Sequence, residues 1–228
     1  MRYLHKPTLK EQFVASGKYR FLLNGTLLQG IESFVVYELP DGAHFIRIDS
    51  DWREHDGSSV LAEALYQPPI LGGHIDRFVT HSIFCPDTMR ETYDFFENKV
   101  VVGYDDETNT RQDHEHPLPF RYAVALGSPS IIGREALQLA ELGVPYLTYR
   151  GFDVLDVESV VETMQARVLA EEPIEVDGRL INARKIALGN VDNPHDAQTL
   201  WVDSRGVMLR LESPDGQTIQ LTDYAYRP

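Results

Sequence analysis

The stretch LWVDSRGVMLRLESPDG, residues 200–216, contains two turn signals on either side of a short run of alternating apolar and polar residues. The turns are Asp203-Ser-Arg-Gly206 and Pro214-Asp-Gly216. Glycine accepts the positive φ of a tight turn, and aspartate can bond to the backbone of its own turn. Between the turns, one face of a strand carries Val207, Leu209 and Leu211, and the other carries Met208, Arg210 and Glu212. The stretch therefore predicts a hairpin strand with one solvated side and a register fixed by its two turns.

The same period-two pattern extends through most of the chain. Residues 18–50 are predicted to form an antiparallel meander of three strands, with Pro40-Asp-Gly42 as a hairpin turn. Further strands are expected at 74–85, 99–104, 120–126, 179–188, 198–203, 206–213 and 217–226. With one more strand over 160–176, the pattern predicts at least ten strands.

Helical signals are few. Residues 130–142 form the clearest helix, because Ser128 or Ser130 can cap its start and Gly143 can end it in the left-handed region. We also expect a short amphipathic helix within 5–16 and one or two helical turns over 58–65. Residues 67–73, with two prolines and two glycines, are expected to be a loop.

Residues 156–171 fit either a helix or a strand. Val160, Val161, Met164 and Val168 share a helical face, but Glu175-Val-Asp-Gly178 is a hairpin signal and requires a strand before it. We favour a strand over about 160–176. Pro173 then implies an edge position or a bulge, because proline donates no ladder hydrogen bond.

These elements predict a mainly β fold. No strand–helix–strand alternation occurs, so a doubly wound α/β fold is disfavoured. We expect a curved, half-open antiparallel barrel of ten or more strands wrapped around one short helix, since closure or curling limits long unpaired edges. The chain is expected to be one domain over 1–228, with two pseudo-halves, 17–104 and 118–228, joined by the polar loop 105–117.

The order of elements carries a family resemblance. Residues 118–226 run strand, serine-capped helix, long hairpins, then Trp201-Val-Asp-Ser-Arg-Gly206, Leu209-Arg-Leu-Glu212 and Asp215-Gly216. This order resembles a group of uncharacterised bacterial β-rich proteins with half-barrel (β-clam) folds like those of lipoprotein carriers and glycolipid-binding proteins. Residues 17–50 resemble the glycine-punctuated opening strands of that group. The resemblance implies a sheet that holds an apolar or lipid-like molecule. It implies no catalytic residues.

Charge and composition restrict the partners. The net charge of −14 and the pI of about 4.9 argue against nucleic acid, which needs a clustered basic face, and favour a neutral, cationic or apolar ligand. The single cysteine, Cys85, excludes an intramolecular disulfide. We see no signal peptide in MRYLHKPTLKEQF and no transmembrane run, so a cytoplasmic location is expected.

Strand 74–85 contains the candidate polar anchors. Its more aliphatic face carries Arg77 and His81, and its other face carries Phe78, Thr80 and Ser82. If the aliphatic face is concave, Arg77 and His81 point into an apolar cavity, paired with an internal carboxylate or with the acidic head group of a ligand. A one-residue slip in register would exchange the two faces. Aromatic residues that could line the same cavity are Tyr19, Phe21, Tyr122 and Trp201.

Other constellations carry weaker hypotheses. His114 and His116 point the same way on an extended segment, as two metal ligands could, but the surrounding Asp113-His-Glu-His116 segment is polar and favours a solvated connector. Cys85 lies on the same side of its strand as His81, yet an unreactive cysteine is favoured. Nucleophile-elbow, phosphate-loop, dinucleotide and zinc-protease motifs are absent from the sequence.

We therefore expect a non-enzymatic binding or carrier protein for an apolar or lipid-like small molecule, without metal, cofactor or catalytic residues. The alternative is a small-molecule enzyme that uses Arg77 as anchor and His81 as acid or base. A second alternative is a structural scaffold whose strand edges recruit a partner or a second copy, forming a homodimer.

Overall fold

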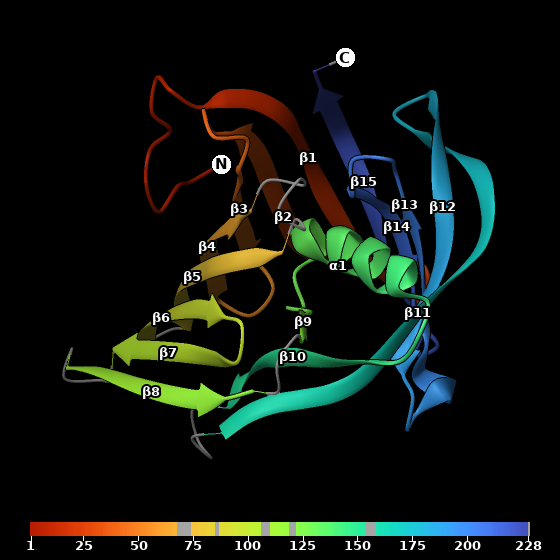
Figure 1. The fold of residues 1–228 in the computed structure, drawn as a ribbon. Coiled ribbons are helices and arrows are strands. Elements are labelled where there is room, and N and C mark those ends of the chain that lie inside the picture. The colour runs from red at the N-terminus through yellow and green to blue at the C-terminus, as the bar shows by residue number, and fades with distance from the viewer. Residues whose placement is uncertain (68–73, 85–86, 106–109, 119–121, 154–157, 228) are drawn as a thin grey trace. The chain divides into compact units, whose positions relative to one another are not determined.

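The computed structural model describes residues 1–67, 74–84, 87–105, 110–118, 122–153 and 158–227, and its elements are labelled in Figure 1. The first eight strands are β1 (Gln12–Leu23), β2 (Thr26–Glu38), β3 (His44–Trp52), β4 (Ser58–Tyr66), β5 (Ile75–Phe84), β6 (Asp87–Phe96), β7 (Lys99–Asp105) and β8 (Arg111–Pro117). Then come β9 (Ala123–Val124), helix α1 (Pro129–Leu142), β10 (Tyr146–Asp153), β11 (Glu158–Val176), β12 (Arg179–Asn190), a short 3-10 turn (Pro194–Asp196), β13 (Gln198–Val202), β14 (Met208–Glu212) and β15 (Gln217–Tyr226).

The 15 strands form one hydrogen-bonded series, in the order β8-β7-β6-β5-β4-β3-β2-β1-β15-β14-β13-β12-β11-β10-β9. Apart from the pair formed by β1 and β15, the pairings follow the order of the chain, as in a meander, and β9 with β10 is a parallel pair. The series begins at β8 and ends at β9, so the ladder of described strands does not close. The prediction of a mainly β fold with ten or more strands and one α-helix is confirmed.

The chain divides into two compact units, which we describe separately. Unit 1 comprises residues 1–18, 29–121 and 225–228, and unit 2 comprises 19–28 and 122–224. Strand β1 contributes its first residues to unit 1 and its last to unit 2. Unit 2 contains two cavities with described walls, and unit 1 contains a cluster of buried charges.

The two turns of residues 200–216 form as expected. Gly206 and Gly216 have φ of 81° and 85°, and β14 pairs with β13 and β15 in antiparallel register. The carboxylate of Asp203 accepts the N–H groups of Arg205 and Val207, both at 2.9 Å. Near the first turn both faces of the strand are buried, since Met208 is as inaccessible as Leu209. The solvated side begins at Arg210.

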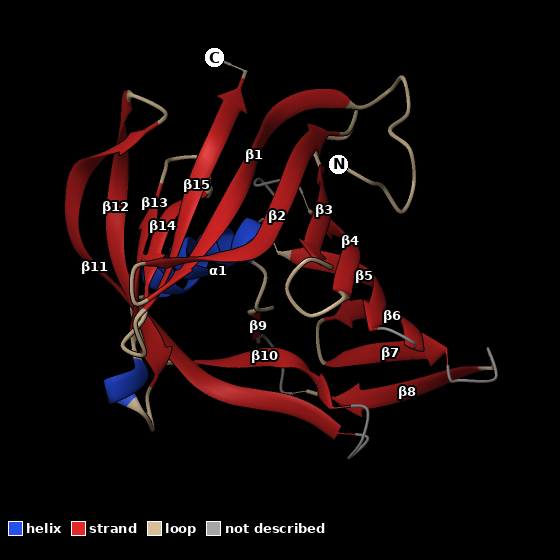
Figure 2. Ribbon diagram, turned by 180° about the vertical axis from the view of Figure 1, so that it is seen from behind, coloured by secondary structure: helices blue, strands red, loops and turns tan. Residues whose placement is uncertain are grey.

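Helix α1 confirms the clearest helical prediction. The Ser128 hydroxyl accepts the N–H of Ser130 at 3.3 Å, and the N–H of Gly143, at φ 66°, donates to Leu139. Ile131, Ala136 and Leu139 are buried on its apolar face. The helix packs on β11–β14 (Figure 2), and these contacts within unit 2 form its core.

The choice of strand for residues 160–176 is also confirmed, by β11. Its pairing with β10 ends at Met164, while β12 pairs along its remaining length and Pro173 lies opposite Asn182. Among the described residues, the part of β11 around Pro173 therefore has a partner on one side only. This is the edge position that proline requires.

Three local predictions were wrong. The helix expected within 5–16 is absent, because Gln12 onward forms β1; the helical turns expected over 58–65 are strand β4; and residues 111–117 of the expected loop form β8. Strand β4 has hydrogen-bonded partners on both sides, β3 and β5, and this tertiary pairing overrides the helical preference of its alanines and leucines. The expected loop at 67–73 lies outside the described residues, except for Gln67.

Candidate functional site

The candidate anchors on β5 do not point into an enclosed site. Arg77 has 54% of its side chain exposed and pairs with Asp94 at 3.3 Å, and His81 is half-buried. The buried face carries Phe78, Thr80 and Ser82 instead, so the expected orientation is wrong. The more aliphatic face of the strand is therefore not the buried one. The more polar face can be buried because a buried carboxylate accepts hydrogen bonds from its side chains.

That carboxylate is Glu91 on the neighbouring strand β6. It accepts hydrogen bonds from the Thr80 hydroxyl at 3.1 Å and from the Tyr93 hydroxyl at 3.0 Å. Burial raises its pKa, although both hydrogen bonds oppose the shift. These hydrogen bonds let β5 bury Thr80 on the face opposite Arg77 and His81.

The four candidate aromatic residues belong to unit 2, whereas Arg77 and His81 belong to unit 1. Tyr19 and Phe21 are buried, and the Tyr19 hydroxyl donates to the carbonyl of Met208 at 2.8 Å. Tyr122 is half-buried. The structure thus describes no single site built from all six predicted residues.

Trp201 contacts charged neighbours. Its indole N–H donates to Glu172 Oε1 at 2.6 Å, and Lys185 Nζ and Arg210 Cζ lie 4.7 Å and 5.5 Å from its ring centroid. It points away from the face of β13 that buries Leu200. The link with Glu172 is nonetheless relevant, because Glu172 lines the larger cavity of unit 2.

The histidines at 114 and 116 share a face of β8, as predicted. Their rings stack with centroids 6.3 Å apart, and His114 also stacks on Tyr104. Within the described part of the chain, no group of three potential ligands is placed to hold a metal ion. Cys85 lies outside the described residues.

Unit 1 contains a cluster of charged and polar side chains, most of them buried, that we call the charged face: Arg47, Asp49 and Asp51 of β3, with Ser59 and Glu63 of β4. Pairing Arg47 with Glu63, and Asp51 with Ser59, puts all five on the same side of the sheet. Arg47, Asp49 and Glu63 are 3%, 7% and 4% exposed. Charged groups this buried require partners, because an uncompensated charge is very costly.

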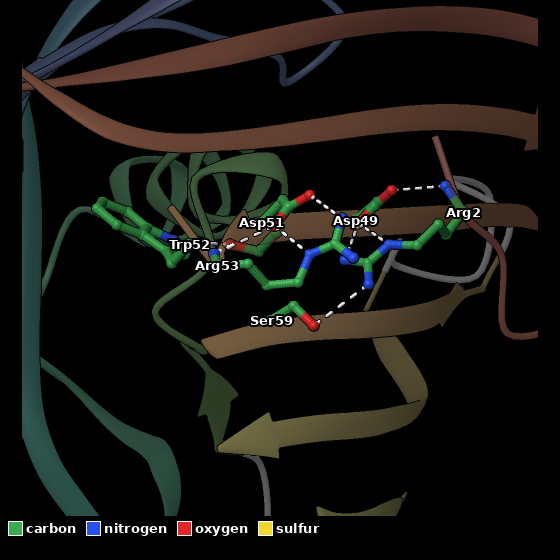
Figure 3. Close-up of polar contacts among 7 residues, drawn as sticks. Arg2, Asp49, Asp51, Trp52, Arg53 and Ser59 are labelled. Carbon is green, nitrogen blue, oxygen red and sulfur yellow. Dashed lines mark hydrogen bonds and ion pairs between the residues drawn. The ribbon is translucent and has the colours of Figure 1, made fainter. Parts of the chain in front are cut away.

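Residues 1–11, here called the arm, supply those partners. Arg2 donates its backbone N–H to Asp49 Oδ2 at 2.5 Å and Nη2 to Asp49 Oδ1 at 2.7 Å, while its Nη1 reaches Ser59 at 3.3 Å (Figure 3). His5 donates its N–H to Glu63 Oε1 at 3.0 Å and places Nδ1 2.7 Å from Oε2. The arm therefore binds two neighbouring carboxylates through both main-chain and side-chain groups.

Arg47 completes the network. Its Nε donates to the carbonyl of His5 at 3.0 Å, and Nη1 and Nη2 donate to the two oxygens of Glu11 at 2.5 Å and 3.0 Å. Burial acts to raise the pKa of Glu11, but the hydrogen bonds from Arg47 and Thr8 and the charge of Arg47 together outweigh it, so the pKa is lowered. Nearby, hydrogen bonds from Arg53 lower the pKa of Asp51 to about 2 (Figure 3). Both of these carboxylates are therefore anionic at neutral pH.

The sequence pattern alone did not reveal the charged face. Its β3 half was visible in HFIRIDSDW, where Arg47, Asp49 and Asp51 alternate with Ile46 and Ile48. Three charges on one face of a strand usually indicate solvent. The contact between the arm and this face could not be predicted from the sequence, because Arg2 and Asp49 are 47 positions apart.

Unit 2 contains a cavity of about 550 Å³. Its walls come from α1, from both strands of the β11–β12 hairpin and from the turn after β13, and they consist of Leu137, Glu141, Glu171, Glu172, Pro173, Asn182, Ala183, Arg184, Val202, Asp203 and Ser204. Four of these carry carboxylates and one carries a guanidinium. The lining therefore has an excess of negative charge.

The carboxylates differ in how they are bound. Asp203 accepts hydrogen bonds within its own turn and from the Tyr224 hydroxyl at 2.7 Å. Glu172 accepts a hydrogen bond from Trp201 and lies 3.7 Å from Lys185. Glu171 pairs with Arg184 at 3.3 Å. Glu141 has no ion pair among the described residues. Glu141 and the exposed Glu171 are therefore the carboxylates most available to a cation in the cavity.

A second cavity of about 200 Å³ lies between the 3-10 turn and β10–β12, with Arg150, Glu162, Asn190, Asn193, Asp196 and Gln198 among its walls. Arg150 pairs with Glu162 at 3.2 Å. The charge of Arg150 also affects the pKa of Glu135 of α1, a side chain that is 3% exposed. Burial raises the pKa of Glu135 to about 8, although the Leu126 N–H and the charge of Arg150 oppose the shift. Glu135 is thus a protonated acid at neutral pH.

Similar folds support the architecture. No protein-family model matches the chain, and no curated protein matches it. A solved structure from Brucella abortus, a beta-barrel-like protein of the domain of unknown function DUF1849, covers 95% of this chain and 99% of its own, with a TM-score of 0.57 at 11% identity. The predicted barrel-like fold is thereby confirmed.

Two further solved structures match more loosely. One is PNGF-II, with a TM-score of 0.33 and 10% identity, covering 95% of this chain and 28% of its own. The other is a DUF1329 family protein from Desulfovibrio piger, with a TM-score of 0.28 and 12% identity, covering 96% and 87%. Neither is close enough to carry an argument. Within the described residues, no helix has the length and apolar character needed to cross a membrane.

Proposed function

We propose that the protein is a non-enzymatic binding protein and that the 550 Å³ cavity of unit 2 takes a small molecule with a cationic group. The observation that carries this proposal is the lining, where four carboxylates face one guanidinium. The volume falls within the usual range for small-molecule sites, about 300–1,000 Å³. A cleft lined by an excess of charge of one sign focuses the field on an ion of the other sign.

The cavity also has firm walls. Helix α1 is capped at both ends, β11 and β12 form a long hairpin, and Asp203 fixes the turn after β13 by two backbone hydrogen bonds. Glu172 is held in place by Trp201. Pre-formed walls reduce the ordering cost of binding.

This proposal changes the expected ligand chemistry from apolar to cationic. The two cavities of unit 2 are lined mainly by polar and charged residues, which favour a polar ligand over a lipid-like one. The enzymatic alternative has less support, since Arg77 is exposed and paired with Asp94. A dimer through strand edges is disfavoured at β8, which carries Arg111, Asp113 and Glu115 and ends in proline.

Calorimetric titration at about 0.15 M salt tests the proposal, with spermidine as the cationic probe and oleate as the apolar probe. We expect saturable 1:1 binding of spermidine and none of oleate. Replacing both Glu141 and Glu171 by glutamine should weaken spermidine about tenfold, since two charge contacts of modest strength are lost.

Glu97→Gln is the matched control, because it removes one exposed carboxylate from a turn of unit 1, whereas the walls of the cavity belong to unit 2. It should leave spermidine affinity unchanged. Equal weakening by the control would mean non-specific attraction to an acidic surface. Saturable oleate binding without spermidine binding would restore the apolar ligand and overturn the proposal.

A further inference from the structure

We propose that the charged face of β3–β4 is a peptide-binding site, distinct from the cavity of unit 2. Its ligand is a peptide segment with two basic side chains three residues apart. The arm fills this site as an internal copy of the ligand, with Arg2 and His5 in the two basic positions.

The contacts have the form of peptide recognition. The two anchoring carboxylates, Asp49 and Glu63, each bind one backbone N–H and one basic side chain of the arm. Arg47 binds a backbone carbonyl of the same segment. Main-chain contacts bind the backbone of the segment whatever its side chains, and the two carboxylates select for basic side chains at the correct spacing.

The arm is held by polar contacts with little apolar burial. Leu9 is fully exposed, and Met1 and the His5 side chain are 47% and 64% exposed. Tyr3, which hydrogen-bonds to Tyr37, is also 38% exposed. Because the arm contributes few buried apolar side chains, it can leave without dismantling a hydrophobic core, and the carboxylates that it covers then regain access to water.

The face keeps its shape without the arm. The Arg47 guanidinium lies 4.5 Å from the ring of Phe45 and 5.2 Å from that of Tyr37, and its Nε lies 3.4 Å from Glu63. These contacts come from the sheet itself. Removal of the arm would leave Asp51 with Arg53 and Glu63 with Arg47 but Asp49 without a cation, an excess of negative charge that complements a basic peptide.

The test uses the full chain and a fluorescently labelled peptide, MRYLHKPTLKE, followed by anisotropy. A variant with Arg2→Ala and His5→Ala weakens the arm and leaves the face intact. We expect it to bind the peptide at least tenfold more tightly than the unaltered chain, whose own arm competes at high effective concentration. Adding Asp49→Asn and Glu63→Gln should abolish the gain. A peptide with glutamate at both basic positions should not bind.

A folded Arg2→Ala/His5→Ala variant that gains no affinity would overturn the proposal, as would equal binding of the glutamate peptide. If that variant does not fold, hydrogen exchange on the unaltered chain decides instead. A large peptide excess should then speed exchange in residues 3–11 and leave β3–β4 protected, and no change would overturn the proposal. Concentration-dependent dimers of the unaltered chain, abolished by Asp49→Asn, would overturn it too, because they would show exchange of arms between two copies in place of a foreign peptide.

Discussion

Gly133 of α1 lies against Gly206 of the turn after β13. A Cβ at position 133 would be 2.6 Å from the carbonyl oxygen of Gly206 and 2.8 Å from the nitrogen of Met208. Real Cβ atoms do not approach backbone this closely, so the helix can contact the sheet here only through glycine. The helix and the hairpin of residues 200–216 therefore pack in close backbone contact at this point.

Gly133→Ala should destabilise unit 2. Alanine favours a helix by about 1 kcal/mol over glycine, but forcing a methyl group against backbone costs about 1–3 kcal/mol, and the clash should win. Urea denaturation followed by circular dichroism measures the change. Gly127→Ala is the control for added volume, because a methyl group at that position would have nothing within 4 Å of it. A Gly133→Ala variant more stable than the unaltered protein would contradict the close packing.

Glu135 should make stability fall as pH rises. Because its pKa is about 8 in the folded state against 4.5 ordinarily, the folded chain retains a proton that the unfolded chain releases. Between about pH 4.5 and 8 this group should lower the free energy of unfolding by up to about 1.4 kcal/mol per pH unit. Glu135→Gln removes that dependence, so the free energy of unfolding of the variant should increase relative to that of the unaltered protein as pH rises.

Urea denaturation at pH 5, 6, 7 and 8 measures this difference. Glu141→Gln, on an exposed position of the same helix, should show no pH-dependent gain. A constant difference between Glu135→Gln and the unaltered protein at all four values would mean that Glu135 is ionised in the folded state.

The parts of the fold that could be predicted from the sequence are mostly those specified by neighbouring residues. The turn at Asp203–Gly206 and the caps of α1 depend on neighbours within a few positions, so their residues specify them directly. Strand β4 could not be predicted, because β3 and β5 impose its conformation on residues with helical preferences. The cavity was unpredictable for a similar reason. Glu141 and Glu171 are far apart in the chain and meet only through the packing of α1 on β11.

Arg47 should be far more important for stability than Arg53 of the same network. Its side chain is 3% exposed and binds both Glu11 and Glu63, so Arg47→Met would leave two buried carboxylates without their cation. Loss of one partner from a buried pair typically costs about 3–5 kcal/mol. Arg53→Met removes an exposed partner of Asp51 and should leave the denaturation midpoint almost unchanged. Similar midpoints for the two variants would show that the arm already lies off the charged face in solution.

Asp203 should be the most sensitive residue of the 200–216 hairpin. It is 2% exposed, and Asp203→Ala would remove the acceptor for two backbone N–H groups and for the Tyr224 hydroxyl. Each buried donor left unsatisfied costs about 1–3 kcal/mol, so we expect a loss of about 3 kcal/mol or more, measured by urea denaturation. Tyr224→Phe removes one of the three bonds and should cost about 1 kcal/mol. Asp215→Ala is the matched control, since Asp215 accepts a similar turn bond from Gln217 in an exposed position. If Asp203→Ala were as mild as Asp215→Ala, the second turn would hold the register alone, and the wall of the cavity would not depend on Asp203.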